Sequence, residues 1–171
     1  MKTIKQLGLF AFLLAATSIL NFSCKSDDDG GGGGAAAEGT ISAKVNGNQF
    51  NSLSMTTSGT MAGSTLSFLG SSTDGKAIQF VVNGIDGTGT YQIGGGANIS
   101  VAASYTEVNI NNPSNTQIWQ APFDDSVAGE ISFSEVSANK VKGTFSFQCK
   151  NVNGDGSVKN VTEGSFNVNL Q

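Results

Sequence analysis

Apolar side chains recur at every second position over much of this chain, and that alternation restricts the fold more than any other feature. The pattern is clearest over residues 98–105, 141–150 and 165–170, where Ser, Thr, Asn, Gln or Lys fill most of the intervening positions. A period of two puts alternate side chains on opposite faces of a β-strand, one buried and one solvated. The chain is therefore expected to be all-β.

Other segments with strand composition are separated by turn signals such as Asn46-Gly47 and Asp86-Gly87. The further expected strands span residues 41–45, 49–55, 64–71, 77–83, 88–93, 117–121 and 129–136. No segment combines a helix start, an apolar stripe and a stop signal. Many short strands at regular spacing predict a single antiparallel β-sandwich or flattened barrel over residues 39–171.

The first 23 residues have the pattern of a secretory signal peptide. Lys2 and Lys5 precede a nearly all-apolar stretch over residues 7–20, which is shorter than the roughly 20 residues that a membrane-spanning helix needs. A basic start, a short apolar core and a small residue before the break are typical of a segment that is removed on export.

Cys24 closes this stretch and directly follows Ser23, in a pattern that resembles the lipobox of bacterial lipoproteins. Asn21 stands three positions before the cysteine, where that motif usually has Leu. The resemblance implies that the Cys24 thiol is acylated, with chains such as palmitate, and becomes the new N-terminus. Acyl chains contribute about 0.8 kcal/mol per buried CH₂, so several hold a domain at a membrane.

An acidic run and a glycine run follow the cysteine. The residues Ser26, Asp27, Asp28 and Asp29 resemble the surface-export signal of lipoproteins from Bacteroidetes-type bacteria. That resemblance implies the outer face of the outer membrane, whereas charge repulsion alone would make the run an extended solvated tether. Residues 30–34 are all Gly and are typical of flexible coil, so residues 24–38 are expected to be anchor, address and tether.

Three further stretches resemble an uncharacterised family of Bacteroidetes lipoprotein domains. They are GTGTYQIGG at residues 87–95, VKGTFSFQCKN at 141–151 and VTEGSFNVNL at 161–170, and the segment at 41–50 is similar to the family's opening hairpin. The resemblance implies a β-rich domain outside the cytoplasm and brings no catalytic residues with it.

Missing residue types exclude several classes of function. The chain has no His, which removes the commonest general base and zinc ligand. All of its basic residues are Lys, and the absence of Arg together with a net charge of −4 argues against nucleic-acid and phosphate ligands. We therefore expect no nucleic-acid partner, no cofactor and no metal site. Once Cys24 is acylated, Cys149 has no partner for a disulfide and is expected in the core.

The segment 109–126 interrupts the strand rhythm and holds the candidate ligand loop. It contains Trp119, Phe123, Asp124 and Asp125, whose aromatic rings and carboxylates suit a neutral glycan or a cation. The alternative is that these aromatics close one end of the core. Residues 151–156 match the first half of a calcium loop, but the closing acid is one residue late, so a hairpin turn is expected.

Together these features predict a surface-exposed, lipid-anchored protein of the outer membrane, serving as a non-catalytic binding or envelope-structural module. Its expected partners are the membrane, through the anchor, and a glycan or an envelope protein. The alternative is a carbohydrate-active enzyme that uses carboxylates, for which the candidates are Glu107, Asp124, Glu130 and Glu135. Adjacent residues of a strand point apart, so Asp124 and Asp125 alone make a poor catalytic pair.

Overall fold

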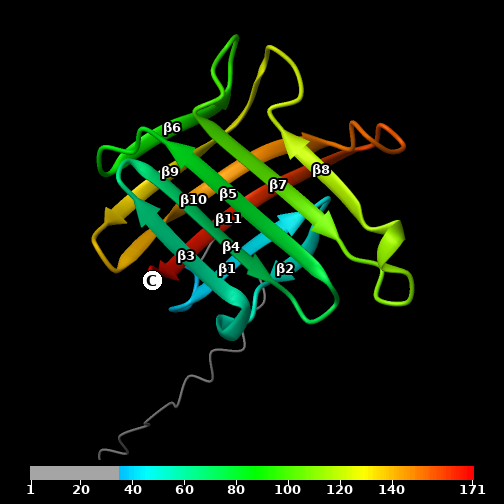
Figure 1. Ribbon diagram of the computed structural model, residues 1–171, viewed down its shortest axis with the longest axis horizontal. Coiled ribbons are helices and arrows are strands. Elements are labelled where there is room, and N and C mark those ends of the chain that lie inside the picture. Colours follow the sequence, from blue (N-terminus) through cyan, green and yellow to red (C-terminus); the bar gives the residue numbers. More distant parts are fainter. Residues whose placement is uncertain (1–34) are drawn as a thin grey trace, which may run out of the picture.

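The computed structural model describes residues 35–171, which form one strongly curled sheet (Figure 1). The strands are β1 (Thr40–Val45), β2 (Asn48–Asn51), β3 (Thr57–Ala62), β4 (Thr65–Ser71), β5 (Lys76–Asn83), β6 (Gly89–Gly94), β7 (Val101–Glu107), β8 (Gln117–Ala121), β9 (Val127–Val136), β10 (Lys140–Lys150) and β11 (Val158–Asn169). Two short 3₁₀ turns, η1 (Ser54–Thr56) and η2 (Pro113–Asn115), are the only helical elements of this described part.

The strands follow the order β2-β1-β11-β10-β8-β7-β5-β4-β3, with antiparallel pairing between neighbours. The end strand β3 curls back toward the end of β11, because Gly59 of β3 forms an isolated parallel bridge with Leu170. The backbone N–H of Gln171 also donates to the Gly59 carbonyl at 2.9 Å. The sheet thus forms a half-barrel whose front layer, β3, β4, β5, β7 and β8, crosses over β9, β10 and β11 (Figure 1).

Strand β10 belongs to two branches of the sheet. From Val141 to Phe147 it pairs with β9, which in turn pairs with β6, while Lys150 at its end pairs with Gln120 of β8. The loop between Ala121 and Val127 bridges the point where the branches separate and contains the cis peptide bond before Pro122. This division gives the β9, β10 and β11 region an outer surface of its own.

The core lies between the two layers and is dominated by phenylalanine rings. Phe68 of β4 contacts Phe166 of β11 with ring centroids 4.9 Å apart, and Phe80 of β5 meets Phe145 at the same separation. Aromatic pairs in these tilted and edge-on arrangements stabilise a core beyond the area that they bury. These contacts join the front and rear strands into one unit.

Two glycines make room for two of these rings. Gly143 pairs with Phe166, and Phe145 pairs with Gly164, across β10 and β11. A Cβ at Gly164 would overlap the Phe145 ring, and a Cβ at Gly143 would lie 2.7 Å from the ring of Phe166. The repeated Gly-x-Phe pattern therefore places each ring over the glycine of the opposite strand.

The all-β prediction is confirmed, and most expected strands lie within one to three residues of the observed ones. Four details differ. The strand expected over 49–55 ends at Asn51 and passes into η1, β3 was not predicted, and β11 begins at Val158 rather than near residue 165. The strand expected from residue 98 begins at Val101, and Ile99 before it is 78% exposed.

Candidate functional site

A hollow of about 200 Å³ lies on the outer surface of β9, β10 and β11. Its polar lining consists of Glu130, Ser132, Thr144, Ser146, Glu163 and Ser165. Apart from Ser165, which is buried, and Glu163, the residues of this lining face outward because they alternate with buried residues such as Ile131, Phe145 and Phe147. The hollow therefore presents hydroxyl and carboxylate groups over a sheet whose other face is the core. We call it the sheet hollow.

A second hollow of about 200 Å³ adjoins the first and shares Ser132 and Thr144 with it. Its lining is more apolar and includes Gly143, Lys142 and the buried Phe133 and Phe166. The two hollows therefore form one elongated depression that is polar at one end and more apolar at the other.

A β-bulge in β11 shapes the polar end. The pairing of β10 with β11 shifts register between Phe145 and Phe147, so that more residues of β11 than of β10 lie between these positions. Glu163 takes up the irregularity with φ of 51°, a left-handed conformation that is uncommon outside glycine. Bulges bend a strand and redirect its side chains. Here the bulge places Glu163 at the rim of the sheet hollow.

The two carboxylates of the sheet hollow differ in their partners. Glu163 forms an ion pair with Lys44 of β1, at 2.8 Å from Nζ to Oε2 and 3.0 Å to Oε1. Glu130 makes none of the ion pairs found within the described residues. The negative charge of Glu163 is thus largely offset, whereas Glu130 remains available as an acceptor.

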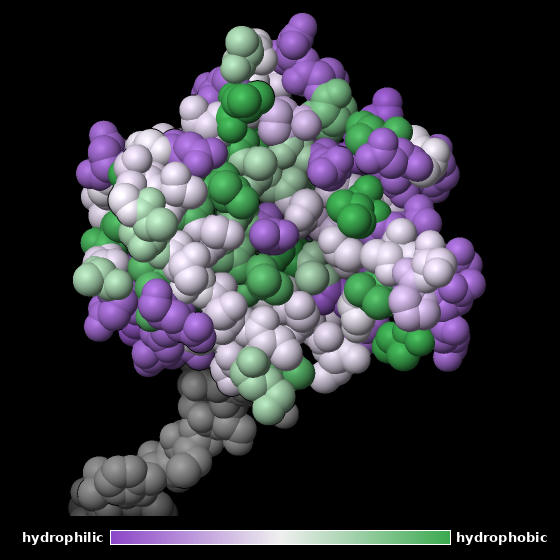
Figure 2. All heavy atoms as spheres, viewed as in Figure 1, coloured by the Kyte–Doolittle hydropathy of each residue, from purple (hydrophilic) through white to green (hydrophobic). Residues whose placement is uncertain are grey.

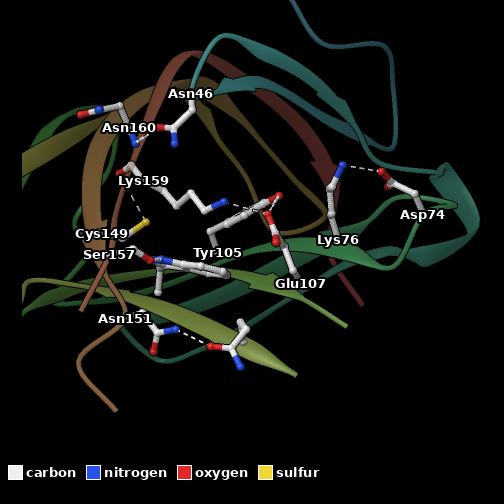
Figure 3. Close-up of polar contacts among 12 residues, drawn as sticks. Asn46, Asp74, Lys76, Tyr105, Glu107, Cys149, Asn151, Ser157, Lys159 and Asn160 are labelled. Carbon is white, nitrogen blue, oxygen red and sulfur yellow. Dashed lines mark hydrogen bonds and ion pairs between the residues drawn. The ribbon is translucent and has the colours of Figure 1, made fainter. Parts of the chain in front are cut away.

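A second polar cluster lies at one end of the half-barrel (Figure 3). Lys159 of β11 lies with its Nζ 3.1 Å from Glu107 and 4.6 Å from the centre of the Trp119 ring. The hydroxyl of Tyr105 donates to Glu107 at 2.9 Å, and the indole N–H of Trp119 donates to Ser157 at 2.9 Å. Cation–π contact and ion pairing together fix Lys159 over the aromatic pair. We call this group the end cluster.

Burial and neighbouring groups shift two pKa values near the end cluster. Burial, followed by the hydrogen bond to Glu107, raises the pKa of Tyr105 far above its usual value. Burial also raises the pKa of the Cys149 thiol to about 12. Cys149 has no exposed surface, and its Sγ donates to the Lys159 carbonyl at 3.7 Å. This thiol has the environment of a packing residue, because reactive cysteines have lowered pKa values.

The residues of the candidate ligand loop are divided between core and surface. Trp119 is only 4% exposed and packs against Tyr105, so its ring offers little surface on which a sugar could stack. Phe123 is half-buried, while Asp124 and Asp125 are exposed in the loop between β8 and β9. The Ser126 hydroxyl and backbone N–H donate to Asp124 and hold the pKa of its carboxyl below the usual value. The structure thus explains Trp119 by packing and Asp124 by turn formation.

The four carboxylates considered for an enzyme lie in different surroundings. Glu107 belongs to the end cluster, Asp124 to the loop, and Glu135 pairs with Lys142 at 4.0 Å. Of these four, Glu130 lines the sheet hollow, where its carboxylate neighbour is Glu163.

Residues 151–157 connect β10 and β11 and form a hydrogen-bonded turn. Buried Asn151 donates through Nδ2 to Gln117 at 2.6 Å, while the backbone N–H of Ser157 donates to Asp155. Across residues 35–171 no three His, Cys, Asp or Glu residues group closely enough to hold a metal ion. The segment that resembles the first half of a calcium loop is thus a turn, and its polar side chains form hydrogen bonds within the protein.

Cys24, Ser26 and the aspartates at positions 27–29 lie outside the described residues. The described part begins at Ala35, and Ala36 is already buried against β11, where its carbonyl accepts from Asn167 Nδ2 at 3.5 Å. Glu38 pairs with Lys140 at 3.0 Å. In the described part no helix has the length and hydrophobicity to cross a membrane.

A family profile matches residues 37–168, which is most of the chain. The chain belongs to the DUF6252 family, a domain of unknown function. No curated protein and no solved structure gives a significant match. The match agrees with the expectation of an uncharacterised β-rich family and assigns no residue a role.

The sheet hollow was not predicted from the sequence, although one signal of it was present. The large buried apolar residues of β11 change from an odd position, Val161, to even positions, Phe166 and Val168. Such a change of parity within one strand indicates a bulge. The Ser and Thr residues of the lining carried no signal, because they look like any solvated strand face.

Proposed function

We propose that this DUF6252 protein is a surface-exposed lipoprotein of the outer membrane, whose β domain is a non-catalytic binding or envelope-structural module. The observation that carries the proposal is Cys24, which stands between the apolar stretch 7–20 and the acidic run 27–29. Ala36, the first buried residue described, follows only 12 positions after Cys24. A lipid anchor followed at once by a folded domain suits a protein that works at a membrane surface.

The charged groups of the domain support a non-catalytic role. Glu107 is engaged by Lys159 and Tyr105, Glu135 by Lys142 and Glu163 by Lys44. Glycosidases need two carboxyl groups facing each other across a bound sugar, about 5–10 Å apart. In these ion pairs the carboxylates are already bound to lysines and are less available for glycoside hydrolysis. The proposed partners are the membrane, through the anchor, and a glycan or an envelope protein.

Substitution of the proposed lipidation site tests the anchor. The full-length Cys24→Ala protein should move from the detergent-rich phase to the aqueous phase in a phase-separation experiment, or accumulate with its signal peptide uncleaved. Cys149→Ala is the matched control and should partition like the wild type, because Cys149 is buried in the domain. Equal partition of wild type and Cys24→Ala into the aqueous phase would reject the lipoprotein.

Replacement of the acidic run tests the surface location. With Asp27, Asp28 and Asp29 all changed to Ala, the lipidated protein should become resistant to protease added to intact cells. Asp124→Ala/Asp125→Ala removes acidic charge from an exposed loop and should leave accessibility unchanged. If the triple variant stays as accessible as the wild type, the acidic run is only a tether.

A further inference from the structure

We propose that the sheet hollow binds an uncharged sugar chain, with Glu130 and the hydroxyls of Ser132, Thr144 and Ser146 as its polar contacts. This inference rests on the proposed binding module and names its ligand class and its site. The site differs from the loop expected from the sequence, because it lies on the strands β9, β10 and β11. Rigid strands hold binding groups more precisely than loops do.

The lining of the sheet hollow matches the chemistry of a polyol. Serine and threonine hydroxyls both donate and accept hydrogen bonds, as sugar hydroxyls do. The Glu130 carboxylate can accept from neighbouring ligand hydroxyls, and hydrogen bonds to a charged acceptor are roughly twice as strong as neutral ones. A row of short hydroxyl side chains with one free carboxylate therefore recognises hydroxyl groups rather than an apolar surface.

The charges of the hollow discriminate against anions. Among the residues described as lining it there is no lysine, and both of its ionisable side chains are acidic. A phosphate or a uronic acid would approach Glu130 without a compensating cation. Like charges placed together in an interface cost several kcal/mol. The unit of the ligand that occupies the sheet hollow is thus uncharged, and Lys142, which lines the second hollow, is itself paired with Glu135.

A divalent cation fits the same lining less well. Calcium takes six to eight oxygen ligands, of which carboxylates supply the charge. Glu163 is already paired with Lys44 at 2.8 Å, so only Glu130 remains to supply an unpaired carboxylate. Serine and threonine hydroxyls add no charge to the site.

The shape of the depression suits several sugar units in a row. Each hollow measures about 200 Å³, and together they reach the range of roughly 300–1,000 Å³ that is usual for small-molecule sites. The second hollow adds Lys142 and the backbone at Gly143, whereas the rings of Phe133 and Phe166 belong to the core and are only 4% and 2% exposed. A chain lying along both hollows would place one unit at the polar end and the next over the apolar end.

Titration calorimetry on the full-length protein in detergent micelles tests this site. The probes are neutral hexasaccharides of glucose, mannose and N-acetylglucosamine in different linkages, with oligogalacturonate as the acidic comparison. We expect at least one neutral probe to bind and oligogalacturonate to bind at least tenfold more weakly. Glu130→Gln and Ser146→Leu should each weaken the neutral probe at least tenfold, the first by removing the charged acceptor and the second by filling the hollow.

Asp125→Asn is the matched control, since Asp125 is an exposed carboxylate in the loop before β9 and lines neither hollow. It should change the affinity less than twofold. Glu130 and Ser146 are exposed, so both variants should unfold at nearly the wild-type temperature, and a melting curve verifies this. The proposal is overturned if no neutral probe binds, if the acidic probe binds as well, or if both hollow variants bind like the wild type.

Two readouts separate this inference from the proposed function. Protease accessibility on intact cells reports the surface location whether or not a sugar binds. Chromatography of the probes after incubation reports catalysis, and intact probes are expected. Cleavage that is lost in Glu130→Gln would keep the sugar site and overturn the non-catalytic role.

Discussion

The front and rear outer surfaces of the half-barrel share one core but differ sharply in chemistry. Outward positions of the front strands β3, β4, β5, β7 and β8 include Thr60, Ser67, Leu69, Gln79, Val81, Ala102, Ser104, Ile118 and Gln120, none of them charged or aromatic. Figure 2 shows this side, with hydrophilic residues mostly at its edges. We call it the neutral face.

The surface of β9, β10 and β11, which we call the grooved face, has the opposite character. It carries Glu130, Glu135, Lys142 and Glu163, and it contains both hollows. The inward residues of the two faces are alike, mainly Phe, Ile and Val. The comparison shows that the fold constrains only the inner half of each strand, while the outer half is free to acquire a site.

Backbone space differs between the faces as well. In the front strands a Cβ at Gly59 of β3 or Gly70 of β4 would meet only side chains, whereas β9, β10 and β11 contain Gly129, Gly143 and Gly164, where a Cβ would meet backbone atoms of the neighbouring strand. All three are positions where a Cβ would overlap a neighbouring strand or ring. Glycine usually weakens a strand and often marks close approach. The grooved face is thus the more tightly constrained of the two.

Gly143→Ala, on the grooved face, should have the largest effect on stability and so tests the difference between the faces most strongly. A Cβ at this position would overlap the Ser132 carbonyl oxygen, which belongs to the backbone of β9 and cannot rotate away. We expect a loss of about 3 kcal/mol or more in the free energy of unfolding, since overpacking costs 1–3 kcal/mol and occasionally more. Ser104→Ala on the neutral face is the control and should stay within about 0.5 kcal/mol. Denaturant unfolding measures both, and equal losses would remove the asymmetry.

The same asymmetry explains what could be predicted from the sequence. Alternation in β7 and β10 revealed their strands directly, because large apolar residues occupy every second position. Strand β3 was missed because Gly59 stands where a buried apolar residue would be expected. That glycine allows Leu170 and Val168 to approach, with a Cβ at position 59 lying 2.8 Å from Leu170. A contact between residues so distant in the chain leaves no local pattern.

The candidate site was less predictable than the fold. Trp119 attracted attention as the sole tryptophan, yet the structure places it on the buried face of β8, between exposed Ile118 and Gln120. Because Ile118 is apolar, the sequence has no alternation here that would have shown it. The sheet hollow depends on the register between β10 and β11 at the Glu163 bulge, which is a property of pairing. Composition identifies an unusual residue, whereas a hollow arises from the relative placement of ordinary ones.

Raising the pH should lower the stability of the folded protein through Cys149, which lies in the core that both faces share. The folded pKa of Cys149 is about 12, above the ordinary thiol value of 9.0 that applies in the unfolded chain. From pH 9 upward the unfolded thiol releases its proton while the folded one keeps it, so stability is full below pH 9 and falls toward pH 12. The slope from one proton is at most about 1.4 kcal/mol per pH unit.

Denaturant unfolding at pH 8 to 11 measures this loss of unfolding free energy. Cys149→Ala should show a shallower decline with pH, because it lacks the thiol, and the decline that is left comes from other titrating groups. At pH 8 the native thiol should also resist a thiol reagent that labels the unfolded chain fully. Rapid labelling of the native protein at pH 8 would mean that the two layers separate readily.

Lys159→Met tests how much the end cluster, where the two layers meet, contributes to stability. The substitution keeps an unbranched side chain over Trp119 but removes the cation that faces its ring at 4.6 Å and Glu107 at 3.1 Å. The Lys159 side chain is 22% exposed, so solvent screens part of the interaction. We expect a loss of about 1–2 kcal/mol in unfolding free energy. Lys150→Met, on an end residue without an ion pair in the described part, should cost less than half as much.

The smallest expected effect concerns salt. Lys44 and Glu163 form an ion pair across β1 and β11, with side chains 31% and 44% exposed. Exposed pairs typically contribute 0.2–1 kcal/mol, so Lys44→Met should lower the unfolding free energy by about 0.5 kcal/mol at low salt. At about 1 M salt the Debye length falls to roughly 3 Å, and the difference from wild type should shrink toward zero. Gln79→Met on the neutral face removes no charge, so its effect should not change with salt. Equal salt responses in these two variants would show that the ion pair does not distinguish the faces. If the Lys44→Met difference persists undiminished at high salt, Lys44 supports the Glu163 bulge by packing rather than by charge.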